Sequence, residues 1–240
     1  MRAIKTVIPF KPDNPKSRLS PVLTEEKRKA FVGLSLQNVL AVLKESGIKQ
    51  VDILSKSALD KSDENRLAAM SGSDFEIKIL IDESDLNTAV NTYLKSSEIP
   101  VLIVMADLAL LKKEDVEAMT NPAAMNRESA FVSANCESEF IAASVSETKA
   151  AACPDIVRIA PGKDGGTNMM YISTPADFEV NYYGESCKKH QEEALRRSFI
   201  CEIHKSFYAA ADMDEPSDLN DILNHGSGEI FEFISKVLKP

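Results

Sequence analysis

The stretch that decides the fold is PVLIVMAD, residues 100–107, a short apolar run that ends on an aspartate. Residues 101–105 carry no polar side chain, and such an unbroken run is typical of a strand that is buried on both faces of a parallel sheet. A sheet of that kind needs helices on both faces, because each face is apolar. The stretch therefore predicts an α/β fold in which the rest of the chain alternates strands with helices.

The sequence before this run alternates in that way. The spacing of apolar residues predicts strands over 3–10, 51–55 and 76–82, and helices over 24–46, 58–70 and 84–97. Thr24, followed by two glutamates, marks the start of the first helix, and Gly47 marks its end. Three successive strand–helix units before residue 100 predict a Rossmann-like half.

The second half of the chain is less regular. It predicts strands over 155–162, 167–173 and 201–210 and helices over 113–120, 184–198, 216–225 and 228–239. Residues 121–154 are rich in alanine and serine and show mixed periodicity, so we interpret them as an insertion. The complete prediction is one α/β domain, residues 1–240, built as a Rossmann-like three-layer sandwich around a mostly parallel central sheet.

Composition excludes some classes of function. The 28 Lys and Arg residues against 37 Asp and Glu give a formal net charge of −9, which argues against a general nucleic-acid binder or a protein of anionic membrane surfaces. No apolar run reaches the roughly 20 residues of a membrane-spanning helix. The four cysteines have no Cys-x-x-Cys spacing and the N-terminus does not resemble a signal peptide, so we expect free thiols in a reducing cytoplasm.

The first candidate site is the loop IPFKPDNPKSRLSP, residues 8–21. Lys11, Lys16 and Arg18 lie between prolines there, and residues 1–18 hold five cations against one anion. A loop that leaves the carboxyl end of the first strand lies where ligands bind in open α/β sheets, and its cations could hold a polyphosphate. The alternative is a solvated basic loop. The prolines favour a site, because a loop that is already ordered loses less entropy on binding.

Acidic residues form the second candidate. Asp107 ends an apolar strand, where a carboxylate should lie at the solvent edge or be paired with a cation. Spacing alone leaves open whether it binds a metal or caps the next helix. The stretch ADMDEPSDL, residues 211–219, adds Asp212 and Asp214, and together with Asp107 these could form an oxygen-rich Mg²⁺ site. Asp218 is simpler to interpret as an acid in the first turn of a helix, and a capping role is also open for Asp214.

Two further stretches offer polar groups for a small substrate. APGKDGGTN, residues 160–168, combines glycines, which let backbone N–H groups approach a phosphate, with Thr167 and Asn168. The alternative is a tight β-turn. In GESCKKH, residues 184–190, Ser186 and His190 stand four positions apart near a predicted helix start, so that they could share one face and meet an anion.

Taken together, these motifs resemble the 2-phospho-L-lactate guanylyltransferase family. The resemblance is carried by IPFKPDNPKSRLSPVLTEEKR, DLNTAVNTYL, VLIVMADLALL, APGKDGGTNMMYIS, YYGESCKKH and AADMDEPSDL, and it covers most of the chain outside 121–154. The family transfers GMP from GTP to a phosphorylated three-carbon acid and releases pyrophosphate, in the biosynthesis of the deazaflavin coenzyme F420. Its members are similar to nucleotidyltransferases of the nucleotide-diphospho-sugar-transferase type.

The resemblance also implies roles for individual residues. The catalytic group is Lys11, Lys16, Arg18 and Asp107, and the nucleotide-binding group is Pro9, Ser17, Leu86, Asn87 and Ala106. A substrate-binding group, which would face the acceptor or the nucleotide, is Gly165, Gly166, Thr167, Asn168, Ser186 and His190. The Mg²⁺ site is Asp107 with Asp212 or Asp214. The partners implied are GTP and a phosphorylated three-carbon acid, with no nucleic acid and no membrane. A homodimer is compatible with the family, although no pattern in the sequence supports it.

Two departures from the family pattern stand out. The usual Asp-Leu-Pro has Ala109 in place of proline, which changes a turn residue and keeps the carboxylate, and the 121–154 insertion is longer than is typical. The alternatives are another nucleotidyltransferase, of the molybdopterin or sugar-phosphate type, and a nucleotide-binding regulatory module without turnover. Two acidic segments argue against the module, because a binder needs no metal-holding residues.

Overall fold

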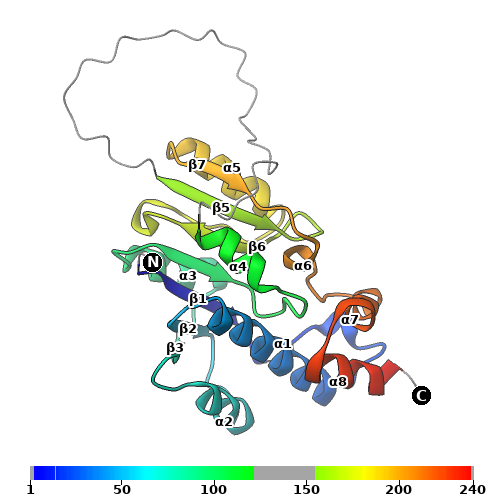
Figure 1. Ribbon diagram of the computed structural model, residues 1–240. Coiled ribbons are helices and arrows are strands. Elements are labelled where there is room, and N and C mark those ends of the chain that lie inside the picture. The colour runs from blue at the N-terminus through cyan, green and yellow to red at the C-terminus, as the bar shows by residue number, and fades with distance from the viewer. Residues whose placement is uncertain (1–2, 14, 122–154, 239–240) are drawn as a thin grey trace, which may run out of the picture.

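The computed structural model describes residues 3–13, 15–121 and 155–238 (Figure 1). Apart from Asn121, the predicted insertion at 121–154 lies outside these residues. No helix in the described ranges has both the length and the apolar character needed to cross a bilayer. Cys187 and Cys201 are free thiols, as predicted; Cys136 and Cys153 lie outside the described residues.

The centre of the fold is a seven-stranded sheet with the strand order β3-β2-β1-β4-β6-β5-β7. All pairs are parallel except those of β6, which runs antiparallel to both of its neighbours. This confirms the predicted mostly parallel sheet. The strands are β1 Lys5–Phe10, β2 Gln50–Ser55, β3 Glu76–Ile81, β4 Val101–Val104, β5 Ile156–Pro161, β6 Thr167–Ile172 and β7 Ile200–Ile203.

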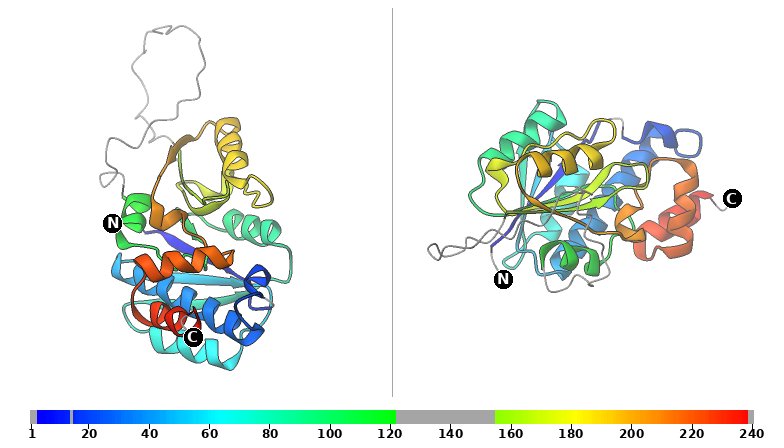
Figure 2. Two further views of the ribbon diagram at one scale, coloured as in Figure 1. Left: turned by 90° about the vertical axis from the view of Figure 1, so that its right-hand side faces the viewer. Right: turned by 90° about the horizontal axis from the view of Figure 1, so that it is seen from above.

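Helices cover both faces of the sheet (Figures 1 and 2). One face packs mainly against α1, α2, α4, α7 and α8, and the other against α3 and α5, which confirms the three-layer sandwich. The helices are α1 Glu25–Glu45, α2 Lys61–Met70, α3 Leu86–Lys95, α4 Lys113–Thr120, α5 Ser186–Arg196, α6 Phe207–Ala210, α7 Leu219–His225 and α8 Gly228–Leu238, with short 3₁₀ turns at Ser17–Leu19, Pro175–Asp177 and Pro216–Asp218.

Burial on both faces explains the unbroken apolar run within residues 100–107. In β4, Leu102 and Val104 pack into the core beneath α1, whereas Ile103 faces the core beneath α3. All three side chains are fully buried. A strand that faces water on one side would alternate apolar and polar residues instead. The unbroken run is therefore the direct consequence of a sheet that is covered twice.

The chain order of the strands reverses at β1. From β1 the chain moves outward through β2 to β3 and then returns to the other side of β1 to form β4. Where neighbouring connections leave in opposite directions, a crevice opens at the carboxyl ends of the strands, and ligands of α/β proteins bind there. In this protein the crevice lies between the segments that follow Phe10 and Val104.

The predicted strand over 201–210 is only partly correct. Strand β7 ends at Ile203, and residues 207–210 form α6. The side chain of Ser206 accepts a hydrogen bond from the Ala209 N–H (3.3 Å), so that it caps this short helix. Among the described strands β7 pairs with β5 alone, and it ends where that pairing ends. The Ser206 cap then draws the next residues into a helix.

Candidate functional site

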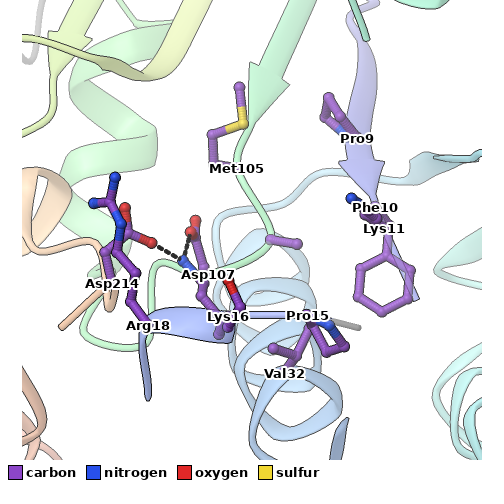
Figure 3. Close-up of a pocket in the computed structure, with 12 residues that line it drawn as sticks. Pro9, Phe10, Lys11, Pro15, Lys16, Arg18, Val32, Met105, Asp107 and Asp214 are labelled. Atoms are coloured by element: carbon purple, nitrogen blue, oxygen red, sulfur yellow. Dashed lines mark hydrogen bonds and ion pairs between the residues drawn. The ribbon is translucent and has the colours of Figure 1, made fainter. Parts of the chain in front are cut away.

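A cavity of about 350 Å³ occupies the crevice between β1 and β4 (Figure 3). Most of the residues predicted to act in catalysis, to bind the nucleotide or to bind a metal line this cavity. Its lining residues are Pro9, Phe10, Lys11, Pro15, Lys16, Ser17, Arg18, Val32, Met105, Ala106, Asp107 and Asp214. The fold thus gathers, in one place, side chains that come from the start, the middle and the end of the chain.

The cationic loop after β1 is held in place by a buried arginine of α1. Arg28 donates hydrogen bonds to the backbone oxygens of Pro15 (3.1 Å) and Leu23 (3.2 Å). Earlier in the loop, Asp13 accepts a hydrogen bond from the Ser57 hydroxyl (2.8 Å). The sequence analysis did not predict the role of Arg28. A signal was present, because Arg28 stands three positions before the buried Phe31 and so shares its helix face.

Lys16 is the central residue of the site. Its ammonium lies between two carboxylates, forming an ion pair with Asp107 and another with Asp214 (2.6 Å), as the dashed lines in Figure 3 show. Burial disfavours the charged ammonium, but the two carboxylates outweigh burial and raise the pKa of Lys16. Lys16 therefore stays protonated at neutral pH.

The backbone of Lys16 is strained. Its φ of 49° and ψ of 51° lie in the left-handed region, which costs a side-chain-bearing residue about 1 to 2 kcal/mol. Such strain persists only where the surroundings impose it, and it is concentrated at functional sites. The anchored loop therefore holds Lys16 in a backbone conformation that an unconstrained loop would not keep, and this conformation fixes the position of the amine.

The capping alternatives for the acidic residues are resolved by Asp218. Its Oδ2 accepts the N–H groups of Asp214 (2.8 Å) and Glu215 (2.7 Å), and its carboxylate pairs with Lys163. The carboxylates of Asp107 and Asp214 make no such backbone bonds among the described residues and face Lys16 instead. The side chain that caps the turn is therefore Asp218, and the other two carboxylates are directed at the cavity.

Asp212 adds an incompletely satisfied carboxyl to the same edge. Its Oδ1 is buried and has no hydrogen-bond partner within the described part of the chain. Burial, and then the charges of Asp107 and Asp214, raise the pKa of Asp212 to about 6. A cation at this point would satisfy the buried oxygen and relieve the repulsion, so the residues fit a divalent metal.

These carboxylates suit a metal ion that takes only a few of its ligands from the protein. Across residues 3–13, 15–121 and 155–238, no three acidic, histidine or cysteine side chains stand close enough to form a complete metal cage. Mg²⁺ commonly takes only one or two protein carboxylates and completes its shell with water and substrate phosphates. Asp107 with Asp212 or Asp214 would supply such a pair.

Lys11 and Arg18 present further positive charge to the cavity. Both residues are exposed, and neither forms an ion pair with any residue that the structure describes. Their charges are thus available to an incoming anion. Lys16, by contrast, is committed to two carboxylates in this structure.

The glycine-rich stretch adopts the turn that was its alternative interpretation. The N–H of Gly165 donates to the oxygen of Gly162 (3.3 Å), the N–H of Gly162 donates to the oxygen of Gly166 (3.0 Å), and Gly165 has a φ of 77°, which favours glycine. Beside the turn, Thr167 and Asn168 are buried and bond inside the protein, Asn168 to the oxygen of Ala209 (3.0 Å). None of these residues lines the cavity.

His190 is fully buried, together with Ser186. Its Nε2 accepts the N–H of Asn181 (2.9 Å), so the neutral ring carries its proton on Nδ1, which faces the Thr167 hydroxyl (2.9 Å). Burial, and then the charge of Lys189, lower the pKa of His190 to about 4. The structure therefore gives His190 the role of a neutral link between β6, α5 and the segment before α5.

We expect His190 to make the protein sensitive to mild acid. An unfolded histidine has a pKa near 6.5, so His190 contributes stability that is complete above pH 6.5 and is lost as the pH falls toward 4, by up to about 3 kcal/mol. Urea unfolding between pH 7.5 and 4.5 measures this loss. His190→Gln should be less stable than the wild type at pH 7.5 and should lose less stability on acidification. The exposed His225→Gln should keep the wild-type slope, and equal slopes for all three proteins would contradict the assignment.

Leu86 and Asn87, both predicted to bind the nucleotide, have different surroundings in the structure. Asn87 Oδ1 accepts the N–H of Tyr182 (2.7 Å) and so attaches the segment before α5 to α3. Leu86 instead lines a second cavity, of about 400 Å³, which the sequence analysis did not predict. The two cavities share the wall formed by Pro9, Phe10, Lys11 and Met105.

Comparison with known proteins agrees with the resemblance that the sequence motifs show. Residues 4–130 and 143–238 match the sequence model of a family described as guanylyl transferase CofC like. The chain is 40% identical over 233 residues to a 2-phospho-L-lactate guanylyltransferase of Methanosarcina barkeri strain Fusaro, which covers 97% of this chain and 92% of the relative. It is also 40% identical to the protein of that name from Methanosarcina mazei, over 96% of this chain and 91% of the relative.

A solved structure supports the fold. A protein from Desulfovibrio desulfuricans G20, assigned to the nucleotide-diphospho-sugar transferases, superposes with a TM-score of 0.68 at 16% identity. The superposition covers 98% of this chain and 95% of that one. This confirms the predicted fold type.

Proposed function

The chain belongs to the family of CofC-like guanylyl transferases, and on that basis we propose that it joins GMP from GTP to 2-phospho-L-lactate, or to a closely related phosphorylated three-carbon acid, and releases pyrophosphate. The step belongs to deazaflavin coenzyme biosynthesis. The observation that carries the proposal is the cavity in which Lys11, Lys16 and Arg18 face Asp107 and Asp214. A cavity that presents both cations and carboxylates suits a polyphosphate that arrives with a metal ion.

The chemistry explains why the cavity needs no protein nucleophile. A phosphate oxygen of the acceptor attacks the α-phosphorus of GTP, the bond from that phosphorus to the bridging oxygen breaks, and pyrophosphate leaves. The acceptor phosphate is already ionised, so no dedicated base is needed. The barrier comes from bringing two anions together in line, and it is lowered by positioning and by neutralising charge. Lys11 and Arg18 bind the triphosphate in this scheme, and Lys16 neutralises charge at its centre.

The proposed metal is Mg²⁺, held by Asp107 with Asp212 or Asp214. Support comes from the buried Oδ1 of Asp212, which has no hydrogen-bond partner among the described residues. It also comes from the pKa of Asp212, which is raised by burial and then by the negative charges of Asp107 and Asp214. When bound, the ion would neutralise the phosphates and orient them for attack. Asp107, and Asp214 if it is the second ligand, would give up its pairing with Lys16 in favour of the metal, which would free the ammonium for the triphosphate.

The predicted substrate-binding residues act indirectly in this proposal. Gly165, Gly166, Thr167, Asn168, Ser186 and His190 do not line either cavity. The oxygen of Asn168, however, accepts the N–H of Met105 (2.9 Å), a residue that lines both. We propose that this group supports the wall of the site without touching the acceptor. A homodimer and a cytoplasmic location remain predictions.

Product analysis tests the proposal. GTP or CTP is offered with 2-phospholactate, phosphoenolpyruvate or a phosphoglycerate in the presence of Mg²⁺, and the products are identified by mass spectrometry while released pyrophosphate is counted. We expect a guanylylated phospho-acid from GTP, with much less product from CTP. Nucleotide binding without pyrophosphate release under every acceptor would contradict the enzyme assignment. Products that form equally from CTP would contradict the choice of base.

A further inference from the structure

The second cavity has a wall of mixed character that the proposed chemistry does not yet use. Its apolar side is formed by Leu54, Leu86 and Ala89, and the ring of Tyr183, which is 55% exposed, stands at its margin. Its polar side is formed by Lys56, Asp82, Ser84 and Asp85. A cavity with apolar surfaces and a few convergent polar groups is the usual form of a small-molecule site.

The fold places Lys56 and Asp82 next to each other. Strands β2 and β3 are parallel, with Ser55 paired to Ile81, and the N–H of Asp82 donates to the oxygen of Ser55 (2.9 Å). Lys56 and Asp82 are therefore the first residues beyond two neighbouring strand ends. They lie on the same edge of the sheet as the first cavity, because the ends of β1, β2 and β3 all point there.

Asp82 has a carboxylate oxygen to offer. Ser84 donates its N–H (3.0 Å) and its hydroxyl (2.5 Å) to Oδ1, while Oδ2 has no partner among the described residues. These bonds from Ser84 lower the pKa of Asp82, so the group is ionised at neutral pH. Lys56 is exposed and forms no ion pair within the described ranges.

Asp85 lies in the same wall but is already in use. Its Oδ1 accepts the N–H groups of Asn87 (3.0 Å) and Thr88 (3.4 Å), and its Oδ2 accepts the Thr88 hydroxyl (2.6 Å). It is the cap of α3. Asp82 is therefore the carboxylate of this wall that a ligand can engage.

The chemistry of guanine matches this pair of charges. Its N1–H and 2-amino group are donors, and its O6 is an acceptor. A carboxylate beside an ammonium satisfies that edge, whereas adenine offers a donor where guanine has O6 and an acceptor where guanine has N1–H. We infer that the second cavity holds the guanine base, with Asp82 accepting from N1–H and the 2-amino group and Lys56 donating to O6.

This inference rests on the proposed function and deepens it. The base would lie beside Leu86 and Tyr183 while the triphosphate crosses the shared wall, past Lys11, to Lys16. The other candidate occupant is the phosphorylated acid, which carries several negative charges. In the wall of the second cavity Asp82 and Asp85 offset the charges of Lys11 and Lys56, whereas the first cavity has Lys11, Lys16 and Arg18 against Asp107 and Asp214. The second cavity therefore attracts such an anion less than the first.

The test is a change of base preference. Xanthine has a carbonyl oxygen where guanine has its 2-amino group, so an amide in place of the carboxylate can donate to it. We expect Asp82→Asn to bind GTP about 30-fold more weakly than the wild type, because a charge-assisted bond is lost, and to prefer XTP over GTP. Competition of GTP, XTP and ATP against a fluorescent GTP analogue measures this without requiring turnover. The adjacent, exposed Glu83→Gln should keep the wild-type order of GTP above XTP.

A second variant tests the other half of the pair. Lys56→Ala should narrow the preference for GTP over ATP, because the donor to O6 is lost. An Asp82→Asn protein that still prefers GTP to XTP would overturn the inference, and so would a variant whose KM for the acceptor rises while its base preference is unchanged. These outcomes are separate from failure of the proposed function. A protein that selects GTP by Asp82 and releases no pyrophosphate with any acceptor would retain the inference and refute the reaction.

Discussion

Asp107→Asn should lower pyrophosphate release from GTP about 1,000-fold or more while the protein stays folded. The substitution keeps the shape of the side chain and removes its negative charge. In the structure the Asp107 carboxylate pairs with Lys16 and makes no backbone hydrogen bond among the described residues, so its charge supports no local turn. Its loss should therefore weaken metal binding and leave the fold unchanged.

The dependence on Mg²⁺ separates a ligand role from general damage. The rate of the Asp107→Asn protein should need a higher Mg²⁺ concentration for half its maximum, and its circular dichroism and unfolding midpoint should stay near those of the wild type. Asp164→Asn is a matched control, because Asp164 is an exposed carboxylate on the nearby glycine turn. An Asp107→Asn protein with wild-type turnover would remove Asp107 from the metal site.

Much of the fold follows from the periodicity of the sequence. The unbroken apolar run of β4 requires a sheet covered on both faces, and the Thr24 and Gly47 signals place the ends of α1 within one residue. The failure at 201–210 has a local cause. Aromatic and β-branched residues there favour a strand, but β7 ends after four residues. It pairs with β5 alone among the described strands, and the Ser206 side chain caps the helix that follows.

The candidate site was predictable to the extent that it lies at strand ends. Lys16 and Asp107 follow β1 and β4, and parallel strands bring their carboxyl ends to one edge. The same rule would have indicated Lys56 and Asp82, which follow β2 and β3, but no sequence motif drew attention to them. Spacing alone could not show that His190 points inward, because residues four apart share a face whether that face is wet or buried.

Lys16→Ala should lower kcat/KM for GTP about 100-fold, with a rise in the KM for GTP. The amine is the cation that Asp107 and Asp214 share in this structure, and no other described cation pairs with either carboxylate. Without it, the carboxylates that would hold the metal stay in place while the ammonium beside them is lost, so the triphosphate meets less positive charge. Steady-state pyrophosphate release at varied GTP concentration separates the change in KM from the change in kcat.

Lys16→Gly is the variant that isolates the amine from the backbone. Glycine adopts a φ of 49° without strain, whereas alanine there retains a penalty of about 1 kcal/mol, so the glycine protein should unfold at higher urea than the alanine protein. Both lack the amine and should lose the same activity. If activity returned in the glycine variant, the strained loop and not the charge would be the source of the defect. An unchanged KM for GTP in both would place the triphosphate outside this cavity, because Lys16 is the cation that its two carboxylates share.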